Sequence, residues 1–221
     1  MPVTNVLTAT AAWLAFLHAL APDHWVPFVA LARTNSWSRS KLALVTFLAG
    51  LGHVGTSLVL GLAGILLGQE LSRLQGVEAR RGEMAILLLI GFGIAYLAWG
   101  IKHARHGVNH HHVGVDSLAG AAKTAFLTRF WIFFAVMIFG PCEPMIPLIF
   151  LAWAKGLQPL LSVVGVFSFI TVTMVVAQSL LAYQGLSFFW SRHEDQLARY
   201  SHAIAGATII AVGLLVILFD L

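Results

Sequence analysis

The residues best suited to chemistry lie between His18 and Pro27, where two imidazoles, one carboxylate and two prolines interrupt an apolar run. A charged side chain near the centre of a bilayer costs roughly 2.5–3.5 kcal/mol, so such residues rarely occur there without a partner or a function. A helical proline cannot bond to the carbonyl four residues earlier, so Pro22 should free the carbonyl of His18 and Pro27 that of Asp23. Broken backbone at membrane depth is tolerated where it lines a cavity. The stretch therefore predicts a hydrated cation site in a broken helix.

Imidazole and carboxylate ligands suit divalent nickel, cobalt, zinc or iron. On an unbroken helix His18 and Asp23 would lie about 140° apart around the axis, so a kink at Pro22 is needed to bring them together. His24 and, from the next apolar segment, His53 add two more imidazoles. A permeating ion needs moderate affinity, so only some of these groups are expected to bind at once.

A second stretch with similar features follows at an offset of 120 residues. The aligned pairs include Asp23 and Glu143, Pro27 and Pro147, Phe47 and Phe167, His53 and Thr173, and Gly93 and Gly213. The repeated stretch contains Cys142 and Glu143 among three prolines, so we expect both side chains at the depth of the first stretch. A thiolate from Cys142 would favour softer ions. The candidate metal ligands are therefore His18, Asp23, His24, His53, Cys142 and Glu143.

Each candidate also has a plainer interpretation. His18 and His53 suit hydrogen bonding between packed helices, and Asp23 suits a proton carrier. His24 suits a partner that orients Asp23. Cys142 suits a small buried hydrophobic residue. The joint occurrence of these residues supports the metal site more than any one of them does.

Composition indicates a membrane protein. Of the 221 residues, 59% are hydrophobic and 10% are charged, whereas a soluble domain carries about 25% charged residues. We therefore attribute the formal net charge of +4 to topology and lipid contact, not to binding of nucleic acid. Cys142 is the single cysteine, so an intramolecular disulfide and a dithiol redox mechanism are both excluded.

Six apolar segments are long enough to cross about 30 Å of hydrocarbon. We expect them at residues 6–32, 42–67, 84–101, 126–154, 160–183 and 202–220. Eight of the 13 lysine and arginine residues lie in the first, third and fifth connections, and a ninth, Arg129, follows shortly after the third connection. This bias predicts that both termini lie outside and that the loop at 102–124 lies in the cytoplasm. The membrane that we expect is a prokaryotic inner membrane. The histidines of that loop favour equally a loose metal-binding cluster and a solvated basic loop.

Three spans per repeat give the two halves opposite orientations, as in many transporters. The predicted fold is an all-α membrane protein of six transmembrane helices, arranged as two inverted three-helix repeats with proline-broken helices 1 and 4. Residues 1–101 form the first repeat, 102–124 the histidine-containing loop and 125–221 the second repeat.

The first two segments resemble a known family. His18, Asp23 and His24 match the spacing His-x4-Asp-His of nickel/cobalt permeases of the NicO type, and Leu51-Gly52-His53 is similar to the Leu-Gly-His motif on their following helix. The layout is most similar to the efflux-type members, within the lysine-exporter superfamily. This resemblance implies a permeation site at His18, Asp23, His24 and His53. The Gly140-Pro141-Cys142 stretch resembles an element of transmembrane thiol electron carriers.

The predicted function is secondary transport of a divalent transition metal ion, nickel or cobalt before zinc or iron, with export favoured by the cytoplasmic histidines. The chain has no nucleotide-binding motif, so we expect an ion gradient to drive transport, with protons or another ion as the coupling partner. Asp23 and Glu143 are the expected proton-exchange residues. We expect no enzymatic activity, no required cofactor and no nucleic-acid partner; a homo-oligomer is one option. Two alternatives stay open: a membrane redox or metalloenzyme-accessory protein, and an exporter of small organic solutes.

Overall fold

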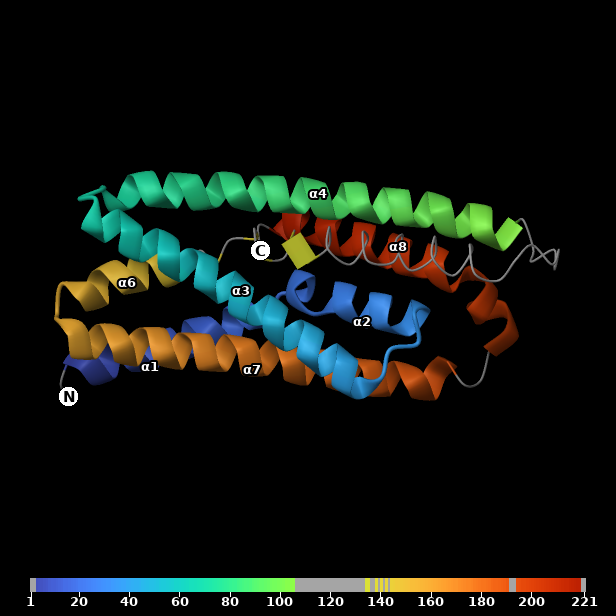
Figure 1. The fold of residues 1–221 in the computed structure, drawn as a ribbon, viewed down its shortest axis with the longest axis horizontal. Helices are drawn as coiled ribbons and strands as arrows, with labels where there is room; N and C mark the ends of the chain where they lie inside the picture. Colours follow the sequence, from blue (N-terminus) through green and yellow to red (C-terminus); the bar gives the residue numbers. More distant parts are fainter. Residues whose placement is uncertain are drawn as a thin grey trace, which may run out of the picture.

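The computed structural model describes residues 3–105, 144–190 and 194–219, together with residues 134, 135, 138, 140 and 142. The elements are α1 (Val3–Ala19), the 3-10 helix η1 (Pro22–His24), α2 (Val26–Thr34), α3 (Arg39–Leu66), α4 (Leu71–Arg105), α6 (Met145–Trp153), α7 (Leu157–Trp190) and α8 (Glu194–Phe219). The described residues form helices and no strands, which confirms the all-α class. Most of the helices run roughly along the longest axis of the molecule (Figure 1).

Four helices, α3, α4, α7 and α8, are long and apolar enough to cross a membrane, and α1 with η1 and α2 makes a fifth if that bent pair is one span. Large apolar side chains on these helices face outwards, including Leu66 (81% exposed), Phe169 (72%) and Leu218 (76%). Soluble monomers avoid large apolar surfaces. The chain is therefore a membrane-embedded helical protein. The expected span at 126–154 lies largely outside the described residues, so the total of six spans stays a prediction.

The apolar segment expected at 84–101 lies within a longer helix, α4, which begins well before it. Gly68 ends α3 with a φ of +63°, and the N–H of Gln69 donates to the carbonyl of Gly64 at 2.9 Å, a pattern that closes a helix C-terminus. The chain then re-enters a helix at Leu71 instead of at residue 84. The charged residues that indicated a loop at 68–83 are mostly the first turns of α4. Similarly, α8 begins at Glu194, before the apolar segment expected at 202–220, and its candidate membrane span, Tyr200–Phe219, agrees with that segment.

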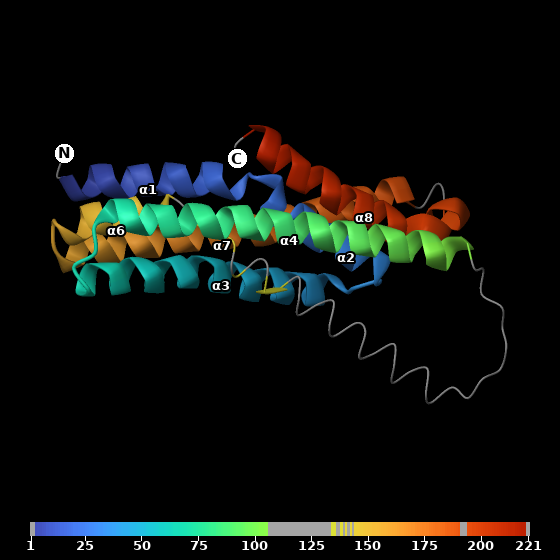
Figure 2. The ribbon, with the colours of Figure 1, turned by 90° about the horizontal axis from the view of Figure 1, so that it is seen from above.

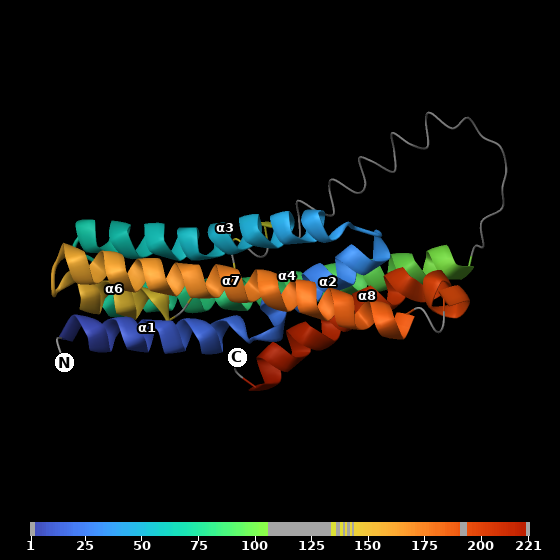
Figure 3. The ribbon, with the colours of Figure 1, turned by 90° about the horizontal axis from the view of Figure 1, so that it is seen from below.

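The order of elements recurs after about 120 residues: short α2 and α6, then long α3 and α7, then long α4 and α8. Each short helix contacts the other half: α2 packs against α7 and α8, and α6 packs against α3 and α4 as well as against α7 of its own half. Two apolar cores result. One contains Phe28 and Ala32 of α2, and the other contains Leu148 and Ala152 of α6. Figures 2 and 3 show α6 near one end of the long axis and α2 towards the other.

Helices α4 and α8 pack side by side through small residues (Figures 1 and 2). A Cβ on Gly93 would lie 2.8 Å from Cγ1 of Ile210, and a Cβ on Gly213 would lie 2.6 Å from Cγ1 of Ile90. These two contacts exchange under the 120-residue offset, which is the pattern that a two-fold axis produces. At Gly206 a Cβ would lie 2.4 Å from a backbone nitrogen of α4. Close approach of membrane helices depends on such small residues.

Candidate metal centre

The first membrane helix breaks where the prolines interrupt it. The axis turns by 74° between the helix that ends at Ala19 and the unit that begins at Pro22. Pro22 starts η1, and the N–H of Ala21 donates to the carbonyl of His18 at 3.2 Å. The kink is where the sequence predicts it. The prediction of a free His18 carbonyl is wrong, because the tight turn before Pro22 uses that carbonyl.

Two other carbonyl groups at the break also have donors. Nε2 of Gln178 on α7 donates to the carbonyl of Ala19 at 3.1 Å, and the indole nitrogen of Trp25 lies 3.4 Å from the carbonyl of Leu20. In an apolar environment each unpaired carbonyl would be costly. Helix α7 of the second half therefore stabilises the break in the first half. The carbonyls of His18, Ala19 and Leu20 therefore all accept hydrogen bonds at the break, whereas the expectation of a free Asp23 carbonyl stays a prediction.

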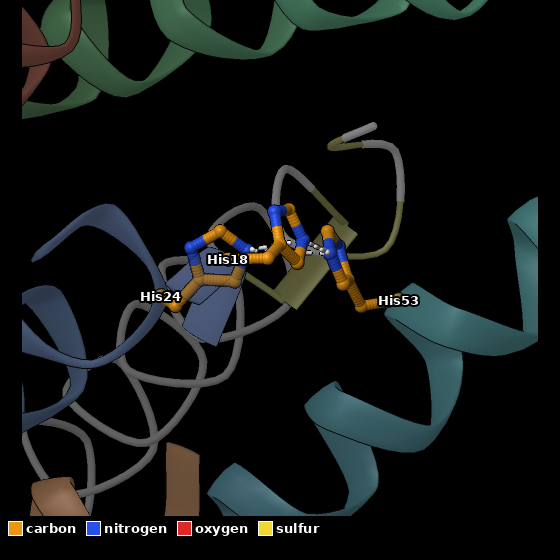
Figure 4. Close-up of side chains that lie close together, drawn as sticks. All are labelled: His18, His24 and His53. Atoms are coloured by element: carbon orange, nitrogen blue, oxygen red, sulfur yellow. Dashed lines mark hydrogen bonds between the residues drawn. The ribbon is translucent and has the colours of Figure 1, made fainter. Parts of the chain in front are cut away.

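Three histidine side chains converge beside the break (Figure 4). His18 comes from the last turn of α1, His24 from η1 and His53 from the middle of α3. Their Nε2 atoms are 3.2 Å apart for His18 and His24, and 3.3 Å apart for each of the other two pairs. His24 and His53 are only 4% and 3% exposed. In the described part of the chain this is the one group of three metal-ligating side chains with such close ligand atoms.

The spacing of this triangle suits a four-coordinate ion. Metal–nitrogen bonds of about 2.0–2.1 Å in a tetrahedral site place the nitrogens roughly 3.3–3.4 Å apart, whereas an octahedral face needs roughly 2.9 Å. The observed separations of 3.2–3.3 Å are closer to the tetrahedral value. Three histidines then leave the fourth position open, which is the arrangement of zinc sites that exchange a ligand.

Asp23 lies behind His24. Its Oδ1 is 2.9 Å from Nδ1 of His24. An ionised carboxylate can only accept, so Nδ1 of a neutral His24 ring carries the hydrogen and Nε2 carries a lone pair directed at His18 and His53. Metal-binding histidines commonly have a carboxylate in this position, where it fixes the tautomer and the ring orientation. In this geometry Asp23 orients His24. The alternative interpretation of the sequence was the reverse, that His24 orients Asp23.

The second half contributes to the surroundings of this group. The buried ring of Phe167 lies 6.3 Å from the ring of His18, centroid to centroid. Cys142 is fully buried in the apolar core around α6 and lies outside the histidine group. Thr173, which the offset pairs with His53, is exposed. Glu143 lies outside the described residues, so its place as a ligand stays a prediction.

An ion pair on α4 lies against the turn of α3 that follows His53, and sequence reasoning missed it. Glu78 is 2% exposed, its Oε2 accepts from Nη1 of Arg81 at 2.8 Å, and its Oε1 accepts from the hydroxyl of Ser57 at 2.8 Å. The available signal was the i, i+3 spacing of opposite charges, which is typical of a helix. Gln178 was missed too, although it is an isolated amide in an apolar helix.

The histidine-rich loop is described only at its start. His103 is exposed at the end of α4, and its ring stacks on Trp99 with centroids 5.2 Å apart. His202 of α8 lies 6.0 Å from His103 by the same measure. The remaining loop histidines lie outside the described residues, so the two interpretations of the loop both stand.

Comparison of the chain with protein families, curated proteins and solved structures finds no match.

Proposed function

We propose that this protein is a secondary transporter of a divalent transition metal ion, which binds at His18, His24 and His53 as it crosses the membrane. The observation that carries the proposal is the triangle of Nε2 atoms with sides of 3.2–3.3 Å. Neutral imidazoles whose lone pairs converge repel one another unless a proton or a metal ion lies between them. A buried site of this kind therefore has a strong electrostatic preference for a cation.

The position of the group supports transport over a purely structural metal site. Structural sites are usually closed by four protein ligands, whereas the described residues supply three and leave a position for exchange. The group also lies at a broken helix that is stabilised from the other half by Gln178. Broken helices at the interface of two repeats are where many secondary transporters bind their substrates.

Further support for two inverted repeats of three spans comes from the recurrence of elements at about 120 residues and from the reciprocal packing of α4 and α8. In this proposal residues 126–154 supply the remaining span, with Glu143 facing the site from the second break. Opposite orientation of the halves would let each break open towards one side of the membrane in turn.

The resemblance to NicO-type nickel/cobalt permeases points to nickel or cobalt as substrate. The spacing of the nitrogens favours ions that accept tetrahedral coordination. Cobalt and zinc should therefore bind more tightly than nickel, which prefers square-planar or tetragonal coordination. We place the protein in a prokaryotic inner membrane, with export driven by protons or another coupling ion.

Metal flux into proteoliposomes tests this proposal. Wild-type protein should move Co²⁺ faster than empty liposomes do, and His18→Ala should lower the rate by about tenfold or more, because even the loss of a group behind a ligand costs about that much. His103→Ala is the matched control, since it removes an exposed imidazole outside the group. Equal rates for wild type and empty liposomes, or for wild type and His18→Ala, would contradict the proposal.

Glu143→Gln tests the contribution of the second break in the same assay. We expect the variant to bind metal but to transport it more slowly, because the carboxylate is proposed to exchange protons. An unchanged rate would remove Glu143 from the mechanism and leave the histidine group in place.

A further inference from the structure

The ion pair of Glu78 and Arg81 is part of a larger polar network between α3, α4 and the chain that precedes α6. Nη2 of Arg81 lies 3.2 Å from Oγ1 of Thr56, 3.4 Å from the carbonyl of Ile138 and 3.5 Å from that of Gly140. Its Nη1 is bonded to Glu78. One guanidinium therefore faces a carboxylate, a hydroxyl and two carbonyl groups from three parts of the chain.

Hydrogen bonds of this network connect the segment before α6 to α3. The hydroxyl of Thr56 is 2.9 Å from the carbonyl of Ile138, and the N–H of Cys142 donates to the hydroxyl of Ser57 at 3.3 Å. A Cβ on Gly52 would lie 2.6 Å from Cγ1 of Ile138, so this segment and α3 are in close contact. The attachment points on α3 lie on both sides of His53 in the sequence.

Thr56 links the network to His53 directly. Its Oγ1 also lies 2.9 Å from the carbonyl of His53. This backbone position carries the imidazole that contacts His18 and His24. A single hydroxyl hydrogen is shared between two carbonyls, while the hydroxyl oxygen accepts from Arg81. Thr56 thus connects Arg81, the carbonyl of Ile138 and the backbone of His53.

The carboxylate, hydroxyl and carbonyl oxygens that the described residues place around Arg81 are typical ligands of hard cations. We propose that they form a second cation site, distinct from the histidine group, in which the guanidinium of Arg81 acts as a tethered cation. Its presence holds Ile138, Gly140 and Cys142 against the helix that carries His53. Arg81 is in this sense a positioning residue, and a free cation can replace its side chain when that side chain is removed.

The planar fork of a guanidinium explains why an arginine serves here. Nη1 and Nη2 donate in fixed directions, one to Glu78 and the other towards Thr56 and the carbonyl groups. A compact ammonium group could not reach both sets at once. The Arg81 side chain is 18% exposed and that of Glu78 is 2% exposed, so the cationic partner is the more exposed of the two.

The test is chemical rescue of Arg81→Ala, measured as the melting temperature of the purified full chain. The variant should melt roughly 5–10 °C below wild type, because it leaves a buried carboxylate without its partner. Millimolar guanidinium should restore roughly half of that loss, since a ligand that binds the native state stabilises it. Sodium should restore less and choline none. Arg80→Ala is the matched control, because Arg80 is an exposed neighbour on the same helix.

Failure of guanidinium to raise the melting temperature of Arg81→Ala more than that of Arg80→Ala would overturn the inference. If Arg81→Ala does not fold, the double variant Glu78→Gln with Arg81→Ala removes the uncompensated carboxylate and should fold. This double variant should show no rescue, and rescue that persists without the carboxylate would equally overturn the inference. These melting measurements need no transition metal. Their outcome therefore tests the second cation site independently of the proposed transport.

Discussion

Asp23→Asn is the substitution that distinguishes the arrangement in the structure from the simpler idea that Asp23 is itself a metal ligand. The side chain keeps its size and loses its charge. In the structure Oδ1 of Asp23 accepts from Nδ1 of His24 at 2.9 Å, and Asp23 is not among the three side chains whose ligand atoms converge. The variant therefore perturbs the orientation and the basicity of one ligand and removes none.

The magnitude follows from what asparagine can offer His24. With its amide oxygen towards Nδ1, the tautomer is kept and only the charge-assisted part of the bond is lost. With its amide nitrogen there, the hydrogen moves to Nε2 of His24 and that ring can no longer bind. Loss of a carboxylate behind a ligand typically weakens metal affinity about 10–100-fold, which corresponds to roughly 1.4–2.8 kcal/mol.

Competition titration of Co²⁺ against a coloured chelator measures this change on purified protein. Asp23→Asn should raise Kd within that range, Asp23→Glu should have a smaller effect because the charge is kept, and His24→Ala should weaken binding more than either. A Kd for Asp23→Asn higher than that of His24→Ala would mean that Asp23 contributes more than the orientation of His24 and is itself a ligand. A Kd within about twofold of wild type would mean that its bond to His24 is irrelevant to the site.

Three further substitutions test the packing around the site. Gly206→Ala should destabilise the protein by about 1–3 kcal/mol in thermal unfolding, because the new Cβ has no space at the crossing of α4 and α8. Gly91→Ala on α4 should not destabilise it, because nothing lies within 4 Å of the added Cβ. Equal melting temperatures for the two variants would contradict the packing. Gln178→Leu leaves the carbonyl of Ala19 without its donor and should cost about 1–3 kcal/mol, whereas an unchanged melting temperature would show that the bond contributes nothing. Cys142→Ser should leave Co²⁺ affinity within about twofold of wild type, since Cys142 lies outside the histidine group, and a large loss would restore it as a ligand.

The histidine group was largely visible in the sequence. Three imidazoles in otherwise apolar segments predict a shared function, and Pro22 indicates the kink that lets His18 and His24 meet. The kink follows from local chemistry alone, because a proline cannot continue the helical bonding pattern. What the sequence left open was the role of Asp23, because that depends on which nitrogen of His24 faces the carboxylate.

Other features depend on the folded chain and could not be derived from local patterns. Gln178 bonds to a carbonyl 159 residues earlier, and no rule based on spacing along the chain links the two. Charged residues before residue 84 looked like a connection between spans, whereas in the fold they extend α4 and bury Glu78 against α3. A short polar stretch next to an apolar one is ambiguous until its partners are known.

Similarly, the 120-residue offset predicted a duplicated arrangement of helices, and the described elements recur at about that offset. It did not predict which side chains face the site, since His53 is buried in the group while Thr173 is exposed. Pseudo-symmetry constrains the backbone more strongly than it constrains the chemistry of aligned positions.

The central claim, that three imidazoles of His18, His24 and His53 hold a divalent metal ion, is tested most directly by the visible spectrum of bound Co²⁺. The intensity of its ligand-field absorption reports coordination geometry, being strong for tetrahedral and weak for octahedral ions. We predict that one equivalent of Co²⁺ gives the intense tetrahedral spectrum with wild type and with His103→Ala, and that His53→Ala abolishes it. A weak octahedral spectrum, or an intense one that survives His53→Ala, would contradict the claim.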